Sequence, residues 1–328
     1  MTDHWGQQDG TADAVVIGGG AAGLSGALML ARSRRDVLVI DAGSPRNAPA
    51  EGVHGLLGRE GMPPAELLRT GRDEVRRYGG RILDGEVTDA VRAGDGFVVT
   101  LNDGRTIGAR RLLVATGLRD VLPDIPGLAD RWGRDLVHCP YCHGWEVRDR
   151  AIGVVATGDG SVHQALLFRQ LSDDVVYLAN GHEPDDAALA RFDALGIPVV
   201  AGRVATVETA GDRITGVRLD DGAVVARDVL AVASRMEART QGLASLGLRS
   251  VELPGGMGTS IQADEFGRTG IPGVWAAGNV ADAKAQVGAA AAAGALAGAQ
   301  INAELVMEDA DRAVTLRRSA AAEAPAGR

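Results

Sequence analysis

The segment from residue 14 to residue 41 limits the possible fold more than any other part of the chain. Residues 14–17 form an apolar run that predicts a buried strand, and residues 18–23, Gly-Gly-Gly-Ala-Ala-Gly, match the pattern G-x-G-x-x-G. A helical pattern follows, and a second apolar run over 37–40 ends at Asp41. Glycines in such a turn let backbone N–H groups approach a pyrophosphate, and the acid accepts from a ribose hydroxyl. The segment therefore predicts a Rossmann-like unit that binds a dinucleotide.

The only two cysteines of the chain, Cys139 and Cys142, enclose Pro140 and Tyr141 in a C-x-x-C motif. Pro140 suits the first turn of a helix, and a helix N-terminus lowers the pKa of a thiol. A zinc site would need four ligands, and no second cysteine pair exists. A structural disulfide across four residues would constrain little of the unfolded chain. The motif therefore favours a redox-active disulfide, and no metal is expected.

Composition is typical of a two-domain enzyme. The chain has 328 residues, of which 45% are hydrophobic and only 3% aromatic, so its core must consist mainly of aliphatic side chains. The net charge of -9 argues against binding to nucleic acid or to an anionic membrane. Residues 1–11 are polar and give no secretory signal, and the Ala/Gly-rich stretch 287–299 is too short to span a bilayer. Two cysteines in one motif suit a reducing cytoplasm, which is the expected location.

Two later segments favour FAD over NAD. Residues 96–101 and 106–114 read as a hairpin, and the second run leads into Ala-Thr-Gly at 115–117. Near the C-terminus a strand at 274–277 leads to Gly-Asn, and a helix of small residues follows position 287. The N-terminus of such a helix can direct N–H groups at a flavin. Each segment alone could be an ordinary turn, but ordinary turns do not explain why both occur in this order along one chain.

These motifs, in this order, resemble the low-molecular-weight thioredoxin reductase family over about residues 12–306. The stretch Cys-Pro-Tyr-Cys-His-Gly-Trp-Glu at 139–146 is more similar to the branch of FAD-dependent dithiol oxidases that form disulfides in gliotoxin- and holomycin-type metabolites. The usual reductases carry Asp where His143 stands, and Gly-Asp where this chain has Gly278-Asn279.

The resemblance implies an α/β fold with two Rossmann-like (three-layer ββα) dinucleotide-binding domains. Residues 1–117 would form the first part of an FAD domain, and 118–247 an inserted NAD(P)H-like domain that carries the C-x-x-C motif. Residues 248–328 would complete the FAD domain with a C-terminal helix and tail, and 319–328 are expected to be disordered. The family also implies a homodimer.

The resemblance further implies which residues contact FAD. Besides Val87, they come from the glycine turn, the segments at the ends of the first two strands, the Ala-Thr-Gly turn and the late segment that begins with Gly-Asn: Gly18, Gly20, Ala22, Gly23, Asp41, Arg46, Asn47, His54, Ala115, Thr116, Gly117, Gly278, Asn279, Gln286 and Val287. For Arg46 and Asn47, an ordinary polar surface loop is an equally good interpretation.

Four residues would carry the thiol chemistry. In the family layout Cys139 faces the substrate, Cys142 faces the flavin, and His143 directly follows it. An imidazole at position 143 can shuttle the thiol proton. His138 would stabilise a thiolate or simply occupy a turn.

The second βαβ pattern departs from the reductases. Strands are expected at 151–156 and 175–178, with a helix at 162–170 between them. The turn 156–161, Ala-Thr-Gly-Asp-Gly-Ser, lacks the first glycine of the reductase pattern, and Ala-Asn-Gly at 179–181 stands where the family holds the 2′-phosphate of NADPH with arginines. Carboxylates follow at Glu183, Asp185 and Asp186. NADPH binding is therefore not expected, although NADH, or an arginine from elsewhere, stays open.

The favoured function is an FAD-dependent oxidase that converts a small-molecule dithiol to a disulfide through Cys139 and Cys142, with oxygen as acceptor. The alternative is an NAD(P)H-dependent thioredoxin-disulfide reductase, whose partner would be a small redox protein. A third hypothesis is a redox-sensing flavoprotein that binds a protein partner.

Overall fold

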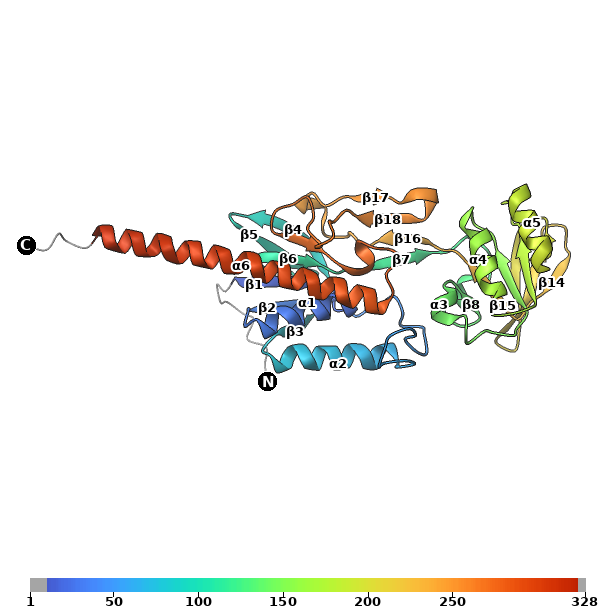
Figure 1. Ribbon diagram of the computed structural model, residues 1–328, viewed down its shortest axis with the longest axis horizontal. Coiled ribbons are helices and arrows are strands. Elements are labelled where there is room, and N and C mark those ends of the chain that lie inside the picture. The colour runs from blue at the N-terminus through green and yellow to red at the C-terminus, as the bar shows by residue number, and fades with distance from the viewer. Residues whose placement is uncertain (1–10, 324–328) are drawn as a thin grey trace, which may run out of the picture.

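The structure is a computed structural model that describes residues 11–323. Figure 1 shows a larger body and a smaller lobe, joined by two strands that run between them. The long C-terminal helix lies along the body and continues beyond it. Of residues 1–11, in which no secretory signal was expected, only Thr11 is among the described residues.

The larger body is built on a seven-stranded sheet with the order β3-β2-β1-β6-β5-β4, and β19 pairs with β6. Strands β3, β2, β1, β6 and β19 run parallel, whereas β4 and β5 continue the sheet as an antiparallel meander. The strands are β1 (Ala12–Ile17), β2 (Val37–Asp41), β3 (Arg81–Asp84), β4 (Val87–Ala93), β5 (Gly96–Leu101), β6 (Thr106–Val114) and β19 (Val274–Ala276).

Side chains of β1 are buried on both faces of this sheet, as expected for a strand inside a parallel sheet. Ala14 and Val16 pack with the helices α1 (Ala21–Arg32) and α6 (Val287–Glu323), and near the end of α2 (Pro64–Arg77) Val75 joins them. Val15 and Ile17 pack on the opposite face, against the β4–β5 meander and residues around Leu243. The body therefore has the three layers of a ββα unit.

The smaller lobe repeats this plan. Its parallel sheet has the order β11-β10-β9-β15-β8, with helices on one face and the three-stranded meander β12-β13-β14 on the other. The elements are β8 (Leu136–Val137), α3 (Pro140–His143), β9 (Ile152–Val155), α4 (Gly160–Arg169), β10 (Val175–Leu178), α5 (Asp186–Leu195), β11 (Val199–Val200), β12 (Val204–Ala210), β13 (Arg213–Leu219), β14 (Val224–Ala226) and β15 (Val229–Val232).

The two connections between body and lobe are paired strands. β7 (Leu118–Val121) leads into the lobe, β16 (Arg235–Ala238) leads back, and they pair antiparallel. β18 (Gly258–Ile261) and β17 (Ser250–Glu252) extend this sheet on the side of the body. Short 3-10 helices occur at Ala129–Arg131, Ala244–Leu246, Pro254–Gly256 and Gly278–Val280. The boundaries after residues 117 and 247 stay a prediction.

Helix α6 explains the Ala/Gly-rich stretch. A Cβ on Gly298 would lie 2.6 Å from the carbonyl oxygen of Gly26, and one on Gly294 would overlap the backbone of Ala22, so only glycines allow α1 and α6 to approach so closely. None of the helices in residues 11–323 is long and apolar enough to cross a membrane.

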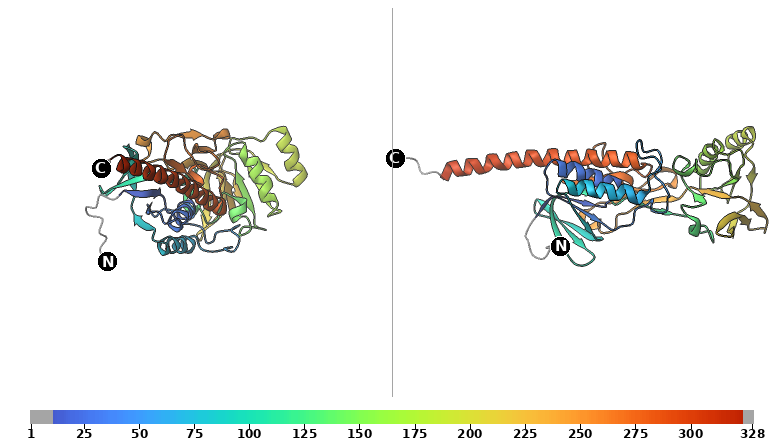
Figure 2. Two further views of the ribbon diagram at one scale, coloured as in Figure 1. Left: turned by 60° about the vertical axis from the view of Figure 1, so that its left-hand side comes forward. Right: turned by 90° about the horizontal axis from the view of Figure 1, so that it is seen from below.

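The C-terminal end of α6 corrects one prediction. Residues 319–323 were expected to be disordered but are helical, because an Ala-rich sequence without glycine or proline continues a helix that has already formed. The remainder of that predicted tail, 324–328, lies outside the described residues. Figure 2 shows the end of α6 projecting from the body without a neighbouring element.

Candidate active site

A cavity of about 1670 Å³ lies where the body, the two connecting strands and the lobe meet. It is lined by nearly every residue that the sequence assigned to FAD: Gly18, Gly20, Ala22, Asp41, Arg46, Asn47, His54, Val87, Ala115, Thr116, Gly117, Gly278, Asn279, Gln286 and Val287. Cys139, Cys142, His138 and His143 line the same cavity. The structure thus brings the two sets of residues into one space, and only Gly23 is absent from its wall.

The glycine turn leaves an open cradle at the start of α1. A Cβ on Gly20 would meet nothing within 4 Å, so the turn faces empty space in the cavity. Gly20 caps α1 without a side-chain hydrogen bond, and the first turn holds no acidic residue. Free N–H groups at a helix N-terminus fit a pyrophosphate. The cradle therefore fits the phosphates of FAD.

Gly18 and Gly23 allow the backbone of the turn to adopt its conformation. Gly18 has φ 110°, a conformation that favours glycine, and a Cβ on Gly23 would overlap the carbonyl oxygen of Gly18. Gly23 packs α1 onto the turn and is not among the residues that line the cavity, so its contact with the cofactor stays a prediction.

Asp41 has a partner that the sequence did not reveal. Its carboxylate forms an ion pair with Arg72 of α2, which also contacts Asp84 at 3.1 Å. The other oxygen of Asp41 accepts from the backbone N–H of Gly43 at 3.3 Å. Arg72 thereby fixes the carboxylate at the end of β2, where the ribose acceptor was expected.

The side-chain amide of Asn279 forms several contacts within the protein that its sequence position does not suggest. Its amide nitrogen donates to the carbonyl oxygens of Asp282 at 3.0 Å and Ala285 at 2.8 Å, and its Oδ1 lies 3.5 Å from Nη1 of Arg46. Asn279 therefore holds the turn that leads into α6, and its polar atoms are largely occupied by the protein itself.

The cysteine pair sits at the start of a helix, as predicted. Cys139 is the N-cap of α3, Pro140 is its first residue, and both cysteines are free thiols that are half-buried. A hydrogen bond from Cys142 lowers the pKa of Cys139 to about 7 against the opposing effect of burial, and N–H groups of the helix start and the charge of Arg46 act in the same direction. The pKa of Cys142 is raised, because it donates to Cys139 and is itself buried. The first deprotonation of the pair therefore belongs to Cys139.

The two flanking histidines differ in their surroundings. Burial lowers the pKa of His143, which is neutral at pH 7, and its Nε2 is buried without a hydrogen-bond partner in the described part of the chain. Burial and then Arg46 lower the pKa of His138, whose Nδ1 lies 3.0 Å from the carbonyl oxygen of Val232 and 3.2 Å from the backbone nitrogen of Ser234. Nε2 of His143 is thus enclosed by the protein, whereas Nδ1 of His138 is tied to the segment that returns to the body.

His54 links the body to the redox motif. Its Nδ1 lies 2.6 Å from Glu60, and its Nε2 lies 3.5 Å from Glu146, which closes the motif 139–146. His54 lines the cavity as expected, but both of its ring nitrogens face carboxylates.

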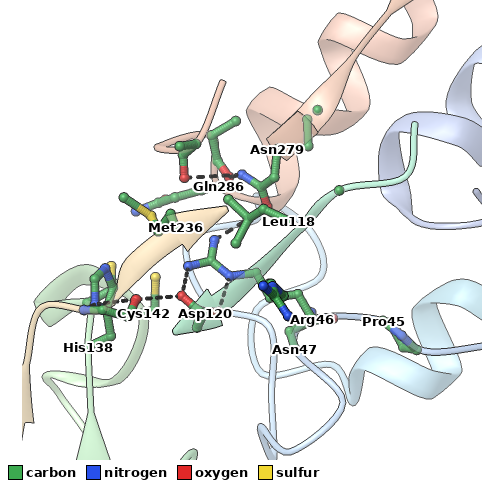
Figure 3. A pocket seen from close by; sticks show the side chains of 18 of the residues that line it. Pro45, Arg46, Asn47, Leu118, Asp120, His138, Cys142, Met236, Asn279 and Gln286 are labelled. Carbon is green, nitrogen blue, oxygen red and sulfur yellow. Dashed lines mark hydrogen bonds and ion pairs between the residues drawn. The ribbon is translucent and has the colours of Figure 1, made fainter. Parts of the chain in front are cut away.

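A further ion pair, which no sequence pattern predicts, joins the loop after β2 to the connecting strand β7. Asp120 on β7 accepts two hydrogen bonds of 2.7 Å from Arg46, and a third of 2.6 Å from the hydroxyl of Ser234, just before β16. Figure 3 shows this contact between Arg46 and Asp120, with His138 and Cys142 beside it. Arg46, Asp120 and Ser234 come from segments more than 70 positions apart, so only the fold brings them together.

The second glycine turn, in the lobe, also opens on the cavity. A Cβ on Gly158 or Gly160 would meet nothing within 4 Å. At the end of β10, the guanidinium carbon of Arg203 lies 3.2 Å from the position that a Cβ of Gly181 would occupy. An arginine from elsewhere in the sequence therefore does reach the turn at 179–181.

Among residues 11–323, no group of three or more His, Cys, Asp and Glu side chains is arranged to hold a metal ion.

Comparison with known proteins gives consistent matches over most of the chain. A family model described as pyridine nucleotide-disulphide oxidoreductase matches residues 12–297. Thioredoxin reductase tcpT of Claviceps purpurea is 38% identical over 81% of this chain and 86% of its own length. Thioredoxin reductase sirT of Leptosphaeria maculans is 32% identical over 88% of this chain and 93% of its own.

Solved structures agree. The crystal structure of HlmI is 45% identical and superposes with a TM-score of 0.90, covering 96% of this chain and 99% of that one. An oxidoreductase from Agrobacterium tumefaciens is 35% identical with a TM-score of 0.85, covering 91% of this chain and 99% of that one.

Proposed function

The chain belongs to the pyridine nucleotide-disulphide oxidoreductase family, whose thioredoxin reductase-like members bind FAD, and on that premise we propose that it oxidises a small-molecule dithiol to a disulfide with oxygen as acceptor. One observation carries the thiol–flavin chemistry of the proposal: the cysteine pair and the FAD cradle line the same cavity. The choice of oxygen over a nicotinamide rests on the lost first glycine at Ala156 and on the carboxylates that follow the turn at 179–181.

The thiol steps take Cys139 as the cysteine that faces the substrate and Cys142 as the one that faces the flavin, as the resemblance implies. A substrate thiolate attacks Sγ of Cys139 in the Cys139–Cys142 disulfide, the enzyme S–S bond breaks, and Cys142 leaves with the electron pair. The second substrate thiolate then attacks the substrate sulfur of the mixed disulfide, and Cys139 leaves as a thiolate. A leaving thiol of low pKa departs faster, and the pKa of Cys139 is about 7.

Bound FAD supplies what the chain lacks, a two-electron acceptor whose reduced form reacts with oxygen to give hydrogen peroxide. The chain's part is to hold that cofactor against Cys142 and to manage the thiol protons.

His143 is the proton carrier in this proposal. The substrate loses two protons on oxidation, and a neutral imidazole that directly follows Cys142 and lines the same cavity is suited to accept one of them. Lowering of its pKa by burial keeps His143 in the accepting form at neutral pH.

The second candidate function is NAD(P)H-dependent reduction of thioredoxin. Arg203 favours it, because its guanidinium lies at the turn where the family holds a 2′-phosphate, and no described group is within hydrogen-bonding or ion-pair distance of it. Against it stand nearby carboxylates: after burial, Glu183 and Asp159 raise the pKa of Tyr177 in the same region. The lost first glycine at Ala156 also argues against it.

The experiment that separates the two is anaerobic reduction of the bound flavin. NADPH, NADH and a small dithiol are compared as donors at equal concentration, and the loss of flavin absorbance is followed in time. The proposal requires rapid bleaching by the dithiol and slow bleaching by both nicotinamides. Rapid bleaching by micromolar NADPH, coupled to reduction of thioredoxin, would establish the second function instead.

We further propose a homodimer in a reducing cytoplasm, paired through the end of α6. Arg35 and Arg110 anchor Asp309 to the body at 2.5 and 2.6 Å, but from residue 310 to residue 320 no side chain is buried. An isolated helix of this length is marginal in water. A partner that covers it would stabilise it.

Charge favours a second copy as that partner. On this projecting segment Asp311 precedes Val314, and Arg317 and Arg318 follow it. Two copies that cross antiparallel at Val314, which is 48% exposed, place Asp311 of each opposite the arginines of the other.

A further inference from the structure

Arg239, which no sequence pattern assigns to a site, links two segments of the cavity wall. It directly follows β16, and its backbone N–H donates to the carbonyl oxygen of Gly117 at 3.0 Å. Its own carbonyl oxygen accepts from the hydroxyl of Thr116 at 2.6 Å. Its Nη1 donates to the carbonyl oxygen of Ser44 at 2.9 Å. Arg239 therefore spans from the Ala-Thr-Gly turn to the loop after β2, and all four of these residues line the cavity.

The charge of Arg239 has no counter-charge within the described chain. The other three arginines that line the cavity form ion pairs with carboxylates: Arg46 with Asp120, Arg119 with Glu237, and Arg235 with Glu237 and Glu252. Arg239 has no such partner among residues 11–323, and its only side-chain hydrogen bond there is the one to Ser44.

Most of the donors of this guanidinium are free and accessible. A guanidinium carries five N–H donors, of which the bond to Ser44 uses one. No nitrogen of Arg239 is among the buried polar atoms that lack a partner, so its remaining donors are open to a ligand.

The surroundings of Arg239 point to the ligand. A Cβ on Gly18 would lie 2.3 Å from the carbonyl oxygen of Ala115, so the turn that holds the Arg239 backbone lies directly against the glycine turn. A Cβ on Gly19 would lie 2.5 Å from Oδ2 of Asp41, so the expected ribose acceptor borders the same glycine turn. The guanidinium is thus held beside the part of the cavity that fits the ribose and phosphates of FAD.

The pyrophosphate is the only charged group of FAD, and the glycine turn meets it with N–H groups alone. Residues 18–23 include no charged side chain. Guanidinium groups bind phosphate oxygens through charge-assisted hydrogen bonds, which are about twice as strong as neutral ones. Arg239 supplies the positive charge that the turn itself lacks.

We propose that Arg239 binds the pyrophosphate of FAD, its free N–H groups donating to phosphate oxygens while Nη1 holds the loop at Ser44. The FAD site then includes a residue from the segment that returns from the lobe, inside the range 118–247 that the resemblance assigned to the inserted domain. This inference goes beyond the proposed function, because it concerns cofactor binding and holds for either direction of electron flow.

The test is the FAD dissociation constant of the full chain, measured by titrating the flavin-free protein with FAD and following flavin fluorescence. Wild type and Arg239→Gln are compared at low salt and at about 1 M salt, where the Debye length is only about 3 Å. Arg239→Gln keeps a hydrogen-bond donor but removes the charge. We expect it to raise the dissociation constant about tenfold to hundredfold at low salt, the range for one hydrogen bond to a charged group.

Salt separates phosphate binding from a purely structural role. A charge–phosphate contact is screened at high salt, so the difference between wild type and Arg239→Gln should shrink there. The bond to the neutral carbonyl of Ser44 is hardly screened, so its loss would raise the dissociation constant by the same factor at both salt concentrations. Arg239→Lys keeps the charge and should bind FAD more tightly than Arg239→Gln.

Arg249→Gln is the matched control, because it removes the same charge from an exposed arginine outside the cavity wall. Its dissociation constant should equal that of the wild type. If Arg239→Gln does not stay folded without FAD, the rate of FAD release from the loaded proteins after dilution gives the same comparison. The inference is wrong if Arg239→Gln holds FAD as tightly as the wild type, or more weakly by one factor at both salt concentrations.

Discussion

The pKa of Cys139 depends on its neighbour, which makes the neighbour's removal informative. The hydrogen bond from Cys142 is the largest cause of the lowered pKa, ahead of the opposing burial and the smaller backbone and Arg46 effects. In Cys142→Ala that bond is lost, so the pKa of Cys139 should rise from about 7 toward its usual range. The rate of alkylation by iodoacetamide between pH 5 and 10 measures this pKa. An unchanged profile in Cys142→Ala would show that the two thiols do not interact.

Gly20 tests the cradle, because its missing side chain leaves the space that the phosphates would occupy. Gly20→Leu should produce a folded but colourless protein, with loss of the flavin absorption band after purification. Gly270→Leu is the control, because it places the same side chain in open space, away from the cavity and at a position without a positive φ. Gly94→Leu would not serve, since Gly94 has φ 57° and any side chain there would strain the backbone. A yellow Gly20→Leu protein with full FAD content would contradict the assignment of the cradle.

Among single residues, the sequence predicted those whose role depends on local spacing. The glycine turn, Asp41, the cysteine pair and the late Gly-Asn segment were all found from short motifs, and all of them except Gly23 line the cavity. Residues that act across long sequence distances left no pattern. Arg72, Asp120, Ser234 and Gln164 are ordinary polar residues until the fold sets them beside Asp41, Arg46 and His138.

At the scale of elements, β7 and β16 are the only strands that pass between body and lobe in the described chain, and Asp120 ties them together. Burial would raise the pKa of Asp120, but hydrogen bonds and charge from Arg46, with Ser234, hold it below its usual range. A carboxyl group with a depressed pKa stabilises the folded state above its unfolded pKa, and loses that effect as pH falls through its folded pKa.

Asp120→Asn should therefore lower the free energy of unfolding by about 1.5–3 kcal/mol at pH 7, the range for a hydrogen bond to a charged group. The deficit should stay constant down to about pH 5 and shrink below about pH 4, where the carboxyl group becomes protonated in the unfolded chain and then, at its lower pKa, in the folded protein. Urea unfolding across this pH range measures it. Asp124→Asn, a carboxyl group before Ile125 without a described partner, is the control. A deficit that grows toward acid pH would contradict the account.

The end of α6 gives the second prediction for an element. The double variant Arg317→Glu with Arg318→Glu, which reverses the charge of both side chains, should raise the dimer dissociation constant about tenfold at low salt. The reason is that each glutamate places a negative charge opposite Asp311 of the partner. Adding Asp311→Arg to the same chain should restore the dimer, since the pattern is then inverted on both copies. Light scattering at a series of concentrations reports the mass. Arg249→Glu, an exposed arginine on the body, should change nothing.

If the wild type is monomeric at every concentration, the proposed dimer does not form. If the wild type is a dimer and neither set of charge reversals changes its dissociation constant, the interface lies elsewhere on the molecule.

Elements were easier to predict than their ends. Apolar runs at 14–17, 37–40 and 175–178 became buried strands, because their periodicity reflects burial on both faces of a parallel sheet. The extent of α6 was not predicted. Its Ala/Gly-rich beginning is decided by close packing on Gly26 of α1, a contact 270 residues away in sequence.

At the scale of the whole molecule, two ββα units meet around one cavity, with the dithiol pair on the lobe and the FAD cradle on the body. This arrangement suits electron flow in either direction. The direction is decided by which external partner reaches the cavity, a dithiol and oxygen or a nicotinamide.

The most direct test of the oxidase account is oxygen consumption by the FAD-loaded protein in air, with dithiothreitol as the only reductant and no nicotinamide present. The account predicts steady oxygen uptake with an equal amount of hydrogen peroxide formed, and loss of both in Cys139→Ser and Cys142→Ser. Oxygen uptake that continues unchanged in both variants would show that the cysteine pair is not involved. No uptake by the wild type, combined with rapid reduction of its flavin by NADPH, would contradict the oxidase account altogether.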